Sequence, residues 1–227
     1  MAGLHGVRPR FLSSVTDTYG LSRYERAHID NELCQTIESA MDGVAVIRSA
    51  MDVISEVDGV VYPILTRGAP FIISKGGLLA TSAHLACTLS IEGKFKLADV
   101  SLHSLGRKYS WNVKLEVVAI DTSSNLAILQ LPADMVEGLK FFKLGSGCRA
   151  GERIFSIGHP QVGTYGVRVS NVYCPDRSFF EYNIPVPNKK FVPRWFKYLE
   201  TGLISGRGLS GGPVVNSSGE VIGVHQS

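Results

Sequence analysis

From residue 44 onward, short apolar runs alternate with turn residues, and this pattern constrains the fold more than any other feature. Each run has the length of a β-strand, and none approaches the ~18 residues of a membrane-spanning helix. Short strands at regular spacing are typical of an all-β barrel or sandwich. The first group of runs comprises Val44–Ile47, Val60–Pro63, Pro70–Ile73, Leu78–Ala83, Leu97–Leu102, Val113–Asp121 and Leu126–Leu131. After a linker from Pro132 to Lys140, the second comprises Arg153–Gly158, Tyr165–Tyr173, Phe179–Tyr182, Phe196–Thr201, Pro213–Asn216 and Val221–His225.

Residues 1–42 differ in composition and are expected to form a partly helical N-terminal extension. The stretch from Leu21 to Met41 is richer in Glu, Arg, Ala and Leu than the rest. Its apolar residues recur at four-residue spacing, which predicts an amphipathic helix that packs on the β body: Ile29, Leu33, Ile37 and Met41. The first 16 residues lack the apolar core of a secretory signal and resemble a transit peptide only in their arginines and serines.

A glycine-rich turn, Gly206–Pro213, carries Ser210 between glycines near the C-terminus. Gly208 and Gly211 allow backbone angles that a Cβ would forbid and leave room for a substrate backbone. In such a turn the N–H groups of Gly208 and Ser210 can point into one small space, as an oxyanion hole requires. Ser210 is therefore the candidate nucleophile.

A second motif lies far upstream, where the apolar run Leu78–Ala80 leads into Thr81, Ser82, Ala83 and His84. A serine hydroxyl needs an adjacent base at neutral pH, and histidine suits this role because its ordinary pKa is near 6.5. A single histidine after a strand is usually an ordinary surface or core residue. Together with the later glycine-rich turn, however, His84 becomes the candidate general base.

These motifs resemble those of the chymotrypsin-fold serine proteases, and of their HtrA-like branch in particular. The resemblance runs from about Val44 to Ser227 and includes four further stretches: Asn125–Leu131, Leu144–Ser146, Gly151–Pro160 and Val221–Val224. It implies two antiparallel β-barrels, residues 43–135 and 136–227, with the active site between them. By the same resemblance, the second barrel is incomplete, because the family's last strand and closing helix are missing.

Asn125 stands where HtrA-like proteins carry the aspartate of the catalytic triad. In a serine protease whose triad aspartate was changed to asparagine, turnover fell ~10⁴-fold because the histidine adopted the wrong tautomer. Asn125 thus indicates a weak enzyme, an inactive protein or an engineered substitution. The alternative is that Asn125 is an ordinary turn residue and that Asp121, four residues earlier, reaches His84.

Two residues are candidates for substrate recognition. Ser205 falls where the family builds the base of the pocket for the residue before the cut, called P1. The segment Gly223–Gln226 resembles the Gly-Ile-His stretch of glutamyl endopeptidases, in which a histidine meets the substrate carboxylate. The resemblance implies a preference for Glu or Gln at P1. The alternative is that His225 is a strand residue bonded within the core.

Composition limits the remaining possibilities. A net charge of +3, without a basic cluster interleaved with aromatics, does not suggest a nucleic-acid surface. The short basic stretch Lys189–Trp195 is more typical of a solvated loop. Four scattered cysteines do not form a zinc motif and, without a signal peptide, are expected to be free thiols. The sequence therefore predicts an intracellular, cytoplasmic protein, with organelle targeting as the alternative, and no membrane partner, metal or cofactor.

The sequence thus predicts a serine endopeptidase that cleaves polypeptides, with Ser210 as nucleophile, His84 as base, and Asn125 orienting the histidine. The alternative is a catalytically inactive module of the same fold that binds peptides or proteins through the same cleft. The oligomeric state is not indicated.

Overall fold

The computed structural model describes residues 23–54, 60–89, 95–105, 108–159, 166–178 and 197–226. The predicted strand Phe179–Tyr182, the basic stretch Lys189–Trp195 and the first 16 residues lie outside these ranges. The described elements are helix α1 (Arg23–Met41), two 3-10 turns, η1 (Ala83–Leu85) and η2 (Ala133–Met135), and strands β1 (Ala45–Ile54), β2 (Val61–Gly68), β3 (Phe71–Ile72), β4 (Leu78–Ser82), β5 (Cys87–Leu89), β6 (Phe95–Leu97), β7 (Asp99–Leu105), β8 (Lys108–Lys114), β9 (Glu116–Asp121), β10 (Leu126–Gln130), β11 (Lys143–Leu144), β12 (Arg153–Gly158), β13 (Gly166–Ser178), β14 (Lys197–Thr201), β15 (Pro213–Asn216) and β16 (Glu220–Val224).

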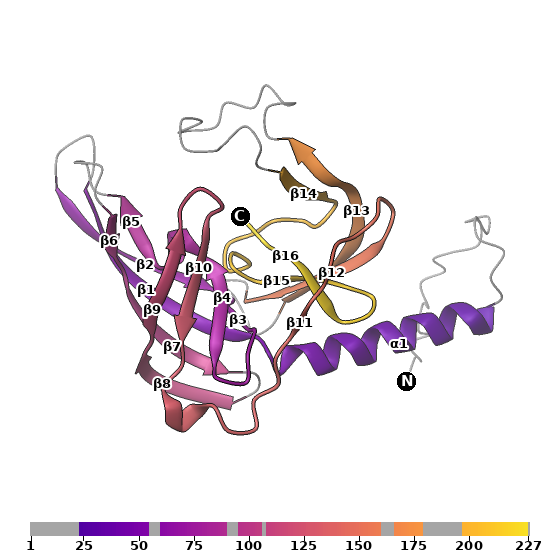
Figure 1. The fold of residues 1–227 in the computed structure, drawn as a ribbon, viewed down its shortest axis with the longest axis horizontal. Coiled ribbons are helices and arrows are strands. Elements are labelled where there is room, and N and C mark those ends of the chain that lie inside the picture. The colour runs from indigo at the N-terminus through magenta and orange to yellow at the C-terminus, as the bar shows by residue number, and fades with distance from the viewer. Residues whose placement is uncertain are drawn as a thin grey trace, which may run out of the picture.

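The first half of the β body contains two four-stranded antiparallel sheets, drawn from purple to rose in Figure 1. Their strand orders are β2-β1-β7-β8 and β3-β4-β10-β9, and a small hairpin of β5 and β6 accompanies them. Buried residues alternate with more accessible ones along β7 and β10, as expected for strands with one face on a core. The two sheets share one apolar core, in which Leu79, Leu102 and Leu129 are almost completely buried.

The second half is a six-stranded sheet in the order β11-β16-β15-β12-β13-β14, drawn from salmon to yellow in Figure 1. Its strands pair antiparallel, except that the two-residue strand β11 runs parallel to β16. Strand β12 lies in the middle of this sheet, and Ile154, Phe155 and Ile157 on it are fully buried. The described chain is therefore predominantly β, as the sequence predicts.

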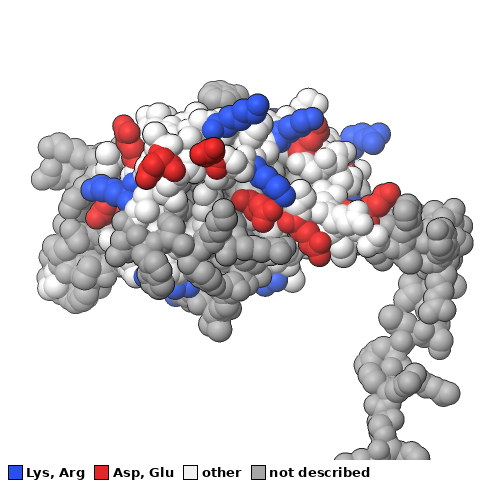
Figure 2. All heavy atoms as spheres, turned by 90° about the horizontal axis from the view of Figure 1, so that it is seen from below, with Lys and Arg blue, Asp and Glu red and all other residues white. Residues whose placement is uncertain are grey.

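Helix α1 lies beside the second half of the molecule (Figure 1). Leu33 is buried, and Ile37 and Met41 pack with it against a core cluster that includes Phe142 and Phe155. The apolar stripe of the helix is thus used as the sequence predicts, although the side chain of Ile29 lies outside the described residues. Charged side chains of both signs are interspersed on the face of the molecule shown in Figure 2.

The run Val113–Asp121 was predicted as one strand, and the structure shows this to be wrong. The strand breaks at Leu115, so that β8 pairs with β7 while β9 pairs with β10 in the other sheet. The buried Leu115 donates its N–H to the carbonyl of Val100 at 2.9 Å as the chain passes between sheets. Both strands contribute to one core, so the apolar pattern continues across the break. The division at residues 135 and 136 remains a prediction.

Candidate active site

His84 lies in the short 3-10 turn η1, directly after strand β4. Strand β4 pairs antiparallel with β10, and this register places Ser82 opposite Leu126. The N–H of Ala83 continues the pairing by donating to the carbonyl of Asn125 at 3.0 Å. Strand pairing therefore brings Asn125 beside His84, although 41 residues separate them in the sequence.

The amide side chain of Asn125 contacts His84 at two points. Its Oδ1 accepts a hydrogen bond from the backbone N–H of His84 at 3.1 Å. At the imidazole, Asn125 Oδ1 and Nδ2 lie 3.3 Å and 3.1 Å from Nδ1. Desolvation lowers the pKa of His84 below its usual 6.5, and the hydrogen bond with Asn125 partly opposes this shift. A lowered pKa keeps the imidazole neutral, as a base must be, at neutral pH.

The two candidates for the group that contacts His84, Asn125 and Asp121, lie at opposite ends of the turn between β9 and β10, where their contacts differ. Asn125 has a φ of 54°, in the left-handed region that Asn and Asp adopt more readily than most residues. Asp121 instead accepts hydrogen bonds from the hydroxyls of Ser123 and Ser124, both at 2.6 Å. These bonds lower the pKa of Asp121 to about 2. Asp121 therefore holds its own turn, and Asn125 is the group at the imidazole.

Ser210 lies in the glycine-rich turn between β14 and β15, and its exposed fraction is 6%. Gly208 and Gly211 have φ values of 93° and 80°, which a residue with a Cβ rarely adopts. The N–H of Leu209 donates a hydrogen bond to the carbonyl of Gly206 at 3.1 Å. Leu209 stands in the sequence between Gly208 and Ser210, whose N–H groups are those predicted for the oxyanion hole. The predicted glycine-dependent turn is therefore present.

The turn with Ser210 docks onto the segment that carries His84. The carbonyl of Ser210 accepts a hydrogen bond from the N–H of Ala69 in the first half, at 3.0 Å. A Cβ on Gly211 would collide with Thr81 Oγ1 and would lie 3.1 Å from the backbone nitrogen of Ser82. Gly211 is required for this close approach, which brings the candidate nucleophile and the histidine turn together.

The two residues predicted for substrate recognition also meet. His225 follows β16, and its Nε2 lies 3.3 Å from the hydroxyl of Ser205. Its backbone is held on both sides by the glycine-rich turn: its carbonyl accepts from Gly211 at 2.9 Å, and its N–H donates to Gly212 at 2.8 Å. Burial of the side chain lowers the pKa of His225. Ser205 and His225 are thus connected to the turn that carries Ser210.

Gln226 is a site residue that the sequence reasoning missed. Its side chain exchanges hydrogen bonds with Asn125 and accepts one from the hydroxyl of Ser82 at 2.9 Å. No local signal marks this residue, because 101 positions separate it from Asn125. Figure 1 shows the chain end leaving β16 and lying between the two halves.

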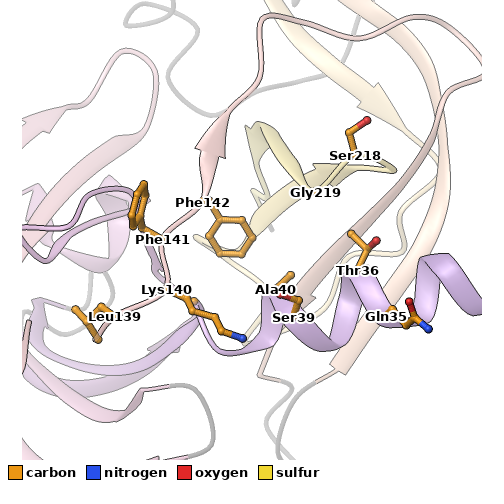
Figure 3. Close-up of a pocket in the computed structure, with 11 residues that line it drawn as sticks. Gln35, Thr36, Ser39, Ala40, Leu139, Lys140, Phe141, Phe142, Ser218 and Gly219 are labelled. Carbon is orange, nitrogen blue, oxygen red and sulfur yellow. The ribbon is translucent and has the colours of Figure 1, made fainter. Parts of the chain in front are cut away.

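An open hollow with a volume of about 690 Å³ lies between α1 and the segment before β11 (Figure 3). Phe142, Ala40 and Gly219 line it, and an ion pair of 2.9 Å between Lys140 and Asp42 lies beside it. The hollow shares no residue with the His84 site. Its lining offers hydroxyl groups and phenyl rings, and no residue predicted for catalysis.

Neither a metal site nor a membrane span is found within the described ranges. They hold no group of three or more His, Cys, Asp or Glu side chains placed to bind a metal ion. Helix α1 is not apolar enough to cross a membrane, and the described chain has no other α-helix. All four cysteines are free thiols.

A histidine before a serine in the chain, in a β fold with the serine on a glycine-rich turn, is the arrangement of the chymotrypsin-like class of peptidases. The chain belongs to the trypsin-like peptidase domain family, whose model matches residues 68–224. Two solved structures have the same fold. The match to Deg5 has a TM-score of 0.59 and 23% identity, and it covers 91% of this chain and 87% of the Deg5 chain. The HtrA-type protease AlgW with tripeptide has a TM-score of 0.59 at 21% identity, covering 85% of this chain and 53% of its own.

Similar sequences are named as HtrA and DegP serine proteases. A probable periplasmic DegP-like serine endoprotease of Hahella chejuensis is 28% identical over 160 residues, which is 70% of this chain and 29% of that protein. The mitochondrial serine protease HTRA2 of Drosophila pseudoobscura pseudoobscura is 31% identical over 162 residues, which is 70% of this chain and 34% of that protein. Serine protease HTRA4 of Mus musculus is 30% identical over 160 residues, which is 70% of this chain and 29% of that protein. The chain thus spans about a third or less of these relatives.

These relatives correct the expectation of a cytoplasmic location, which is wrong. Their names place the DegP-like proteins in the periplasm and HTRA2 in the mitochondrion, which points to a periplasmic or organellar compartment. That expectation rested on the lack of a secretory signal and on cysteines expected to be free thiols, but a domain with a large apolar core needs no disulfides in any compartment. The cysteines therefore do not report the location.

Proposed function

We propose that this chain is a serine endopeptidase domain in which Ser210 is the nucleophile and His84 is the general base. The observation that supports this most strongly is the docking of the Ser210 turn, through Gly211, onto the segment that carries His84. The paired Asn125 and His84 supply the group that orients the base. The names of the relatives agree with this activity.

In the proposed reaction, Ser210 Oγ attacks the carbonyl carbon of the scissile peptide bond and its proton passes to Nε2 of His84. The carbonyl oxygen becomes an oxyanion, which the N–H groups of Gly208 and Ser210 stabilise. His84 then gives the proton to the leaving amine as the C–N bond breaks, and an acyl-enzyme remains. Water, deprotonated by His84, hydrolyses the ester and restores Ser210.

A fluorophosphonate probe, which reacts only with an activated serine, tests this proposal directly. We expect covalent labelling of Ser210 and its loss in His84→Ala, because the hydroxyl then has no base. Ser210→Ala serves as the matched control for labelling elsewhere on the chain. Labelling that persists in His84→Ala would contradict the mechanism. If the folded protein is not labelled at all, the chain is the inactive peptide-binding module instead.

For the substrate we propose a polypeptide with Gln or Glu at P1. The contact between His225 and Ser205 supports a polar pocket beside the Ser210 turn. Among the structural neighbours, an HtrA-type protease holds a tripeptide, which agrees with a polypeptide substrate. A side chain that satisfies a buried polar group is strongly preferred over an apolar one that leaves it unpaired. Because the pKa of His225 is lowered, the imidazole is neutral at pH 7 and favours the neutral Gln.

A further inference from the structure

Both amide atoms of Asn125 lie within hydrogen-bond distance of the imidazole, so this contact alone does not set the tautomer of His84. A base for Ser210 needs the proton on Nδ1 and a free lone pair on Nε2. If Asn125 donated to Nδ1 instead, the proton would move to Nε2 and the base would be blocked. Groups beyond the imidazole must therefore decide which way the amide acts.

Gln226 contacts Asn125 at two places. Gln226 Nε2 donates to the backbone carbonyl of Asn125 at 3.2 Å. In the other direction, Asn125 Nδ2 donates to Gln226 Oε1 at 2.6 Å. The hydroxyl of Ser82 adds a second donor to the same Oε1, at 2.9 Å. Gln226 is exposed while Ser82 is buried, so the Gln226 amide lies on the solvent side of these contacts.

Two backbone groups with fixed roles set the direction of this chain of hydrogen bonds. The carbonyl of Asn125 can only accept, so Gln226 must turn its nitrogen toward it and its oxygen toward Asn125. At the other end, the backbone N–H of His84 can only donate, so it must meet Asn125 Oδ1. Both ends require the same orientation of the Asn125 amide, with its nitrogen toward Gln226 and its oxygen toward the backbone N–H of His84.

We propose that Gln226 is a positioning residue that engages the Asn125 amide nitrogen, so that Asn125 Oδ1 accepts the Nδ1 proton of His84 and leaves Nε2 free as the base. The role of His84 rests on the proposed function, but the tautomer does not. The arrangement avoids the tautomer error that an asparagine otherwise brings to a triad. It also means that Gln226 forms its hydrogen bonds with an amide, and not with a carboxylate, at position 125. A carboxylate there would place an oxygen beside Gln226 Oε1, and two acceptors cannot form a hydrogen bond.

The tautomer can be read by ¹⁵N NMR of histidine-labelled protein at pH 8, with the His84 signals assigned through His84→Asn. We expect the Nδ1–H form in the unmodified chain. In Gln226→Met, which keeps the length but removes both polar atoms, the ratio of Nδ1–H to Nε2–H should fall by about tenfold, the equivalent of one net hydrogen bond. Gln226→Glu should retain the Nδ1–H form, because its oxygen still accepts from Asn125. Gln130→Met is the matched control, because the Gln130 amide bonds to Gly76 and Leu131 instead. This variant should leave the tautomer ratio of His84 unchanged.

A double-mutant cycle on turnover adds a second readout. Asn125→Asp should increase kcat about tenfold more in the Gln226→Met background than in the unmodified chain, because the opposing oxygen is gone. Equal gains in both backgrounds would overturn the proposal. So would an unprotonated Nδ1 in the unmodified chain, or a tautomer ratio unaffected by Gln226→Met. If the protein hydrolyses no peptide but the NMR result holds, the proposed function fails while the role of Gln226 stands.

Discussion

At the scale of single residues, the site depends on the protonation states of its histidines. Burial lowers the pKa of both His84 and His225, which keeps both imidazoles neutral at pH 7. For His84 this is the form that accepts a proton from Ser210 in the proposed reaction. For His225 it sets the charge of the proposed P1 pocket, so substrate choice should depend on pH.

We expect peptides with P1 Gln to be cleaved faster than matched peptides with P1 Glu at pH 7. The preference should shift toward Glu as the pH falls through the lowered pKa of His225, because imidazolium attracts the carboxylate while Glu itself stays ionised above its pKa of about 4.3. The measurement is kcat/KM for paired peptides between pH 5 and pH 8. Ser205→Ala should weaken the preference and His225→Leu should abolish it. A preference for Val, Ala or Arg that survives His225→Leu would contradict the assignment.

At the scale of elements, the turn between β9 and β10 is the feature that presents Asn125. Its conformation depends on the Asp121 carboxylate, which accepts from Ser123 and Ser124, and on the positive φ of Asn125. Aspartate is also tolerated at this φ, so the backbone permits a carboxylate at position 125. The turn thus separates two functions: Asp121 stabilises its shape, and Asn125 meets His84.

Asn125→Asp should raise kcat, because a carboxylate stabilises the imidazolium that forms in the transition state. The gain should stay well below ~10⁴-fold, since the native amide already holds the useful tautomer. Asp121→Ala should lower kcat by less than about tenfold, because its effect on His84 is indirect. Steady-state kinetics on one peptide measures both changes. A large loss in Asp121→Ala, with no gain in Asn125→Asp, would identify Asp121 as the acid instead.

At the scale of the whole molecule, basic groups of the first half act on a buried histidine of the second half. His159 follows β12 in the second half, and its backbone N–H donates to the carbonyl of Gly208 at 2.9 Å. Its side chain is 3% exposed, and its pKa falls to about 4, first through burial and then through Arg67 and His103 of the first half. Protonation of His159 is therefore unfavourable in the folded state.

Acidification should destabilise the protein through His159. The folded-state pKa is about 4 and the ordinary value is 6.5, so the unfolded state binds the proton more readily between these pH values. The contribution to stability is present above pH 6.5 and is lost as the pH falls toward 4. From pH 7 to pH 5 the loss is about 2 kcal/mol, at 1.36 kcal/mol per pKa unit. Urea unfolding at both pH values measures it, and His159→Phe should reduce the difference by about that amount. An unchanged difference in this variant would exclude His159 as the cause.

The sequence predicted those parts of the molecule that leave a local signature. His84 and Ser210 could be proposed as catalytic residues because a strand before a histidine, and a serine among glycines, are short patterns with a chemical reason. The break at Leu115 could not be found, since one apolar run continues through two strands of the same core. Gln226 could not be found either. Its role depends on hydrogen-bond direction across the two halves, and no residue pattern encodes direction.

The matched amides of Asn125 and Gln226 also limit the routes by which this site can change over generations. An aspartate that arises first at position 125 meets the opposing oxygen of Gln226, so the gain in kcat on which selection can act is smaller. A change at Gln226 that arises first loosens the amide and weakens the base. The partner that has not yet changed reduces the gain of the first step or makes that step harmful, so the order of substitutions matters. The pair therefore constrains further change: an aspartate at position 125 gives its full advantage only after a compensating change at Gln226.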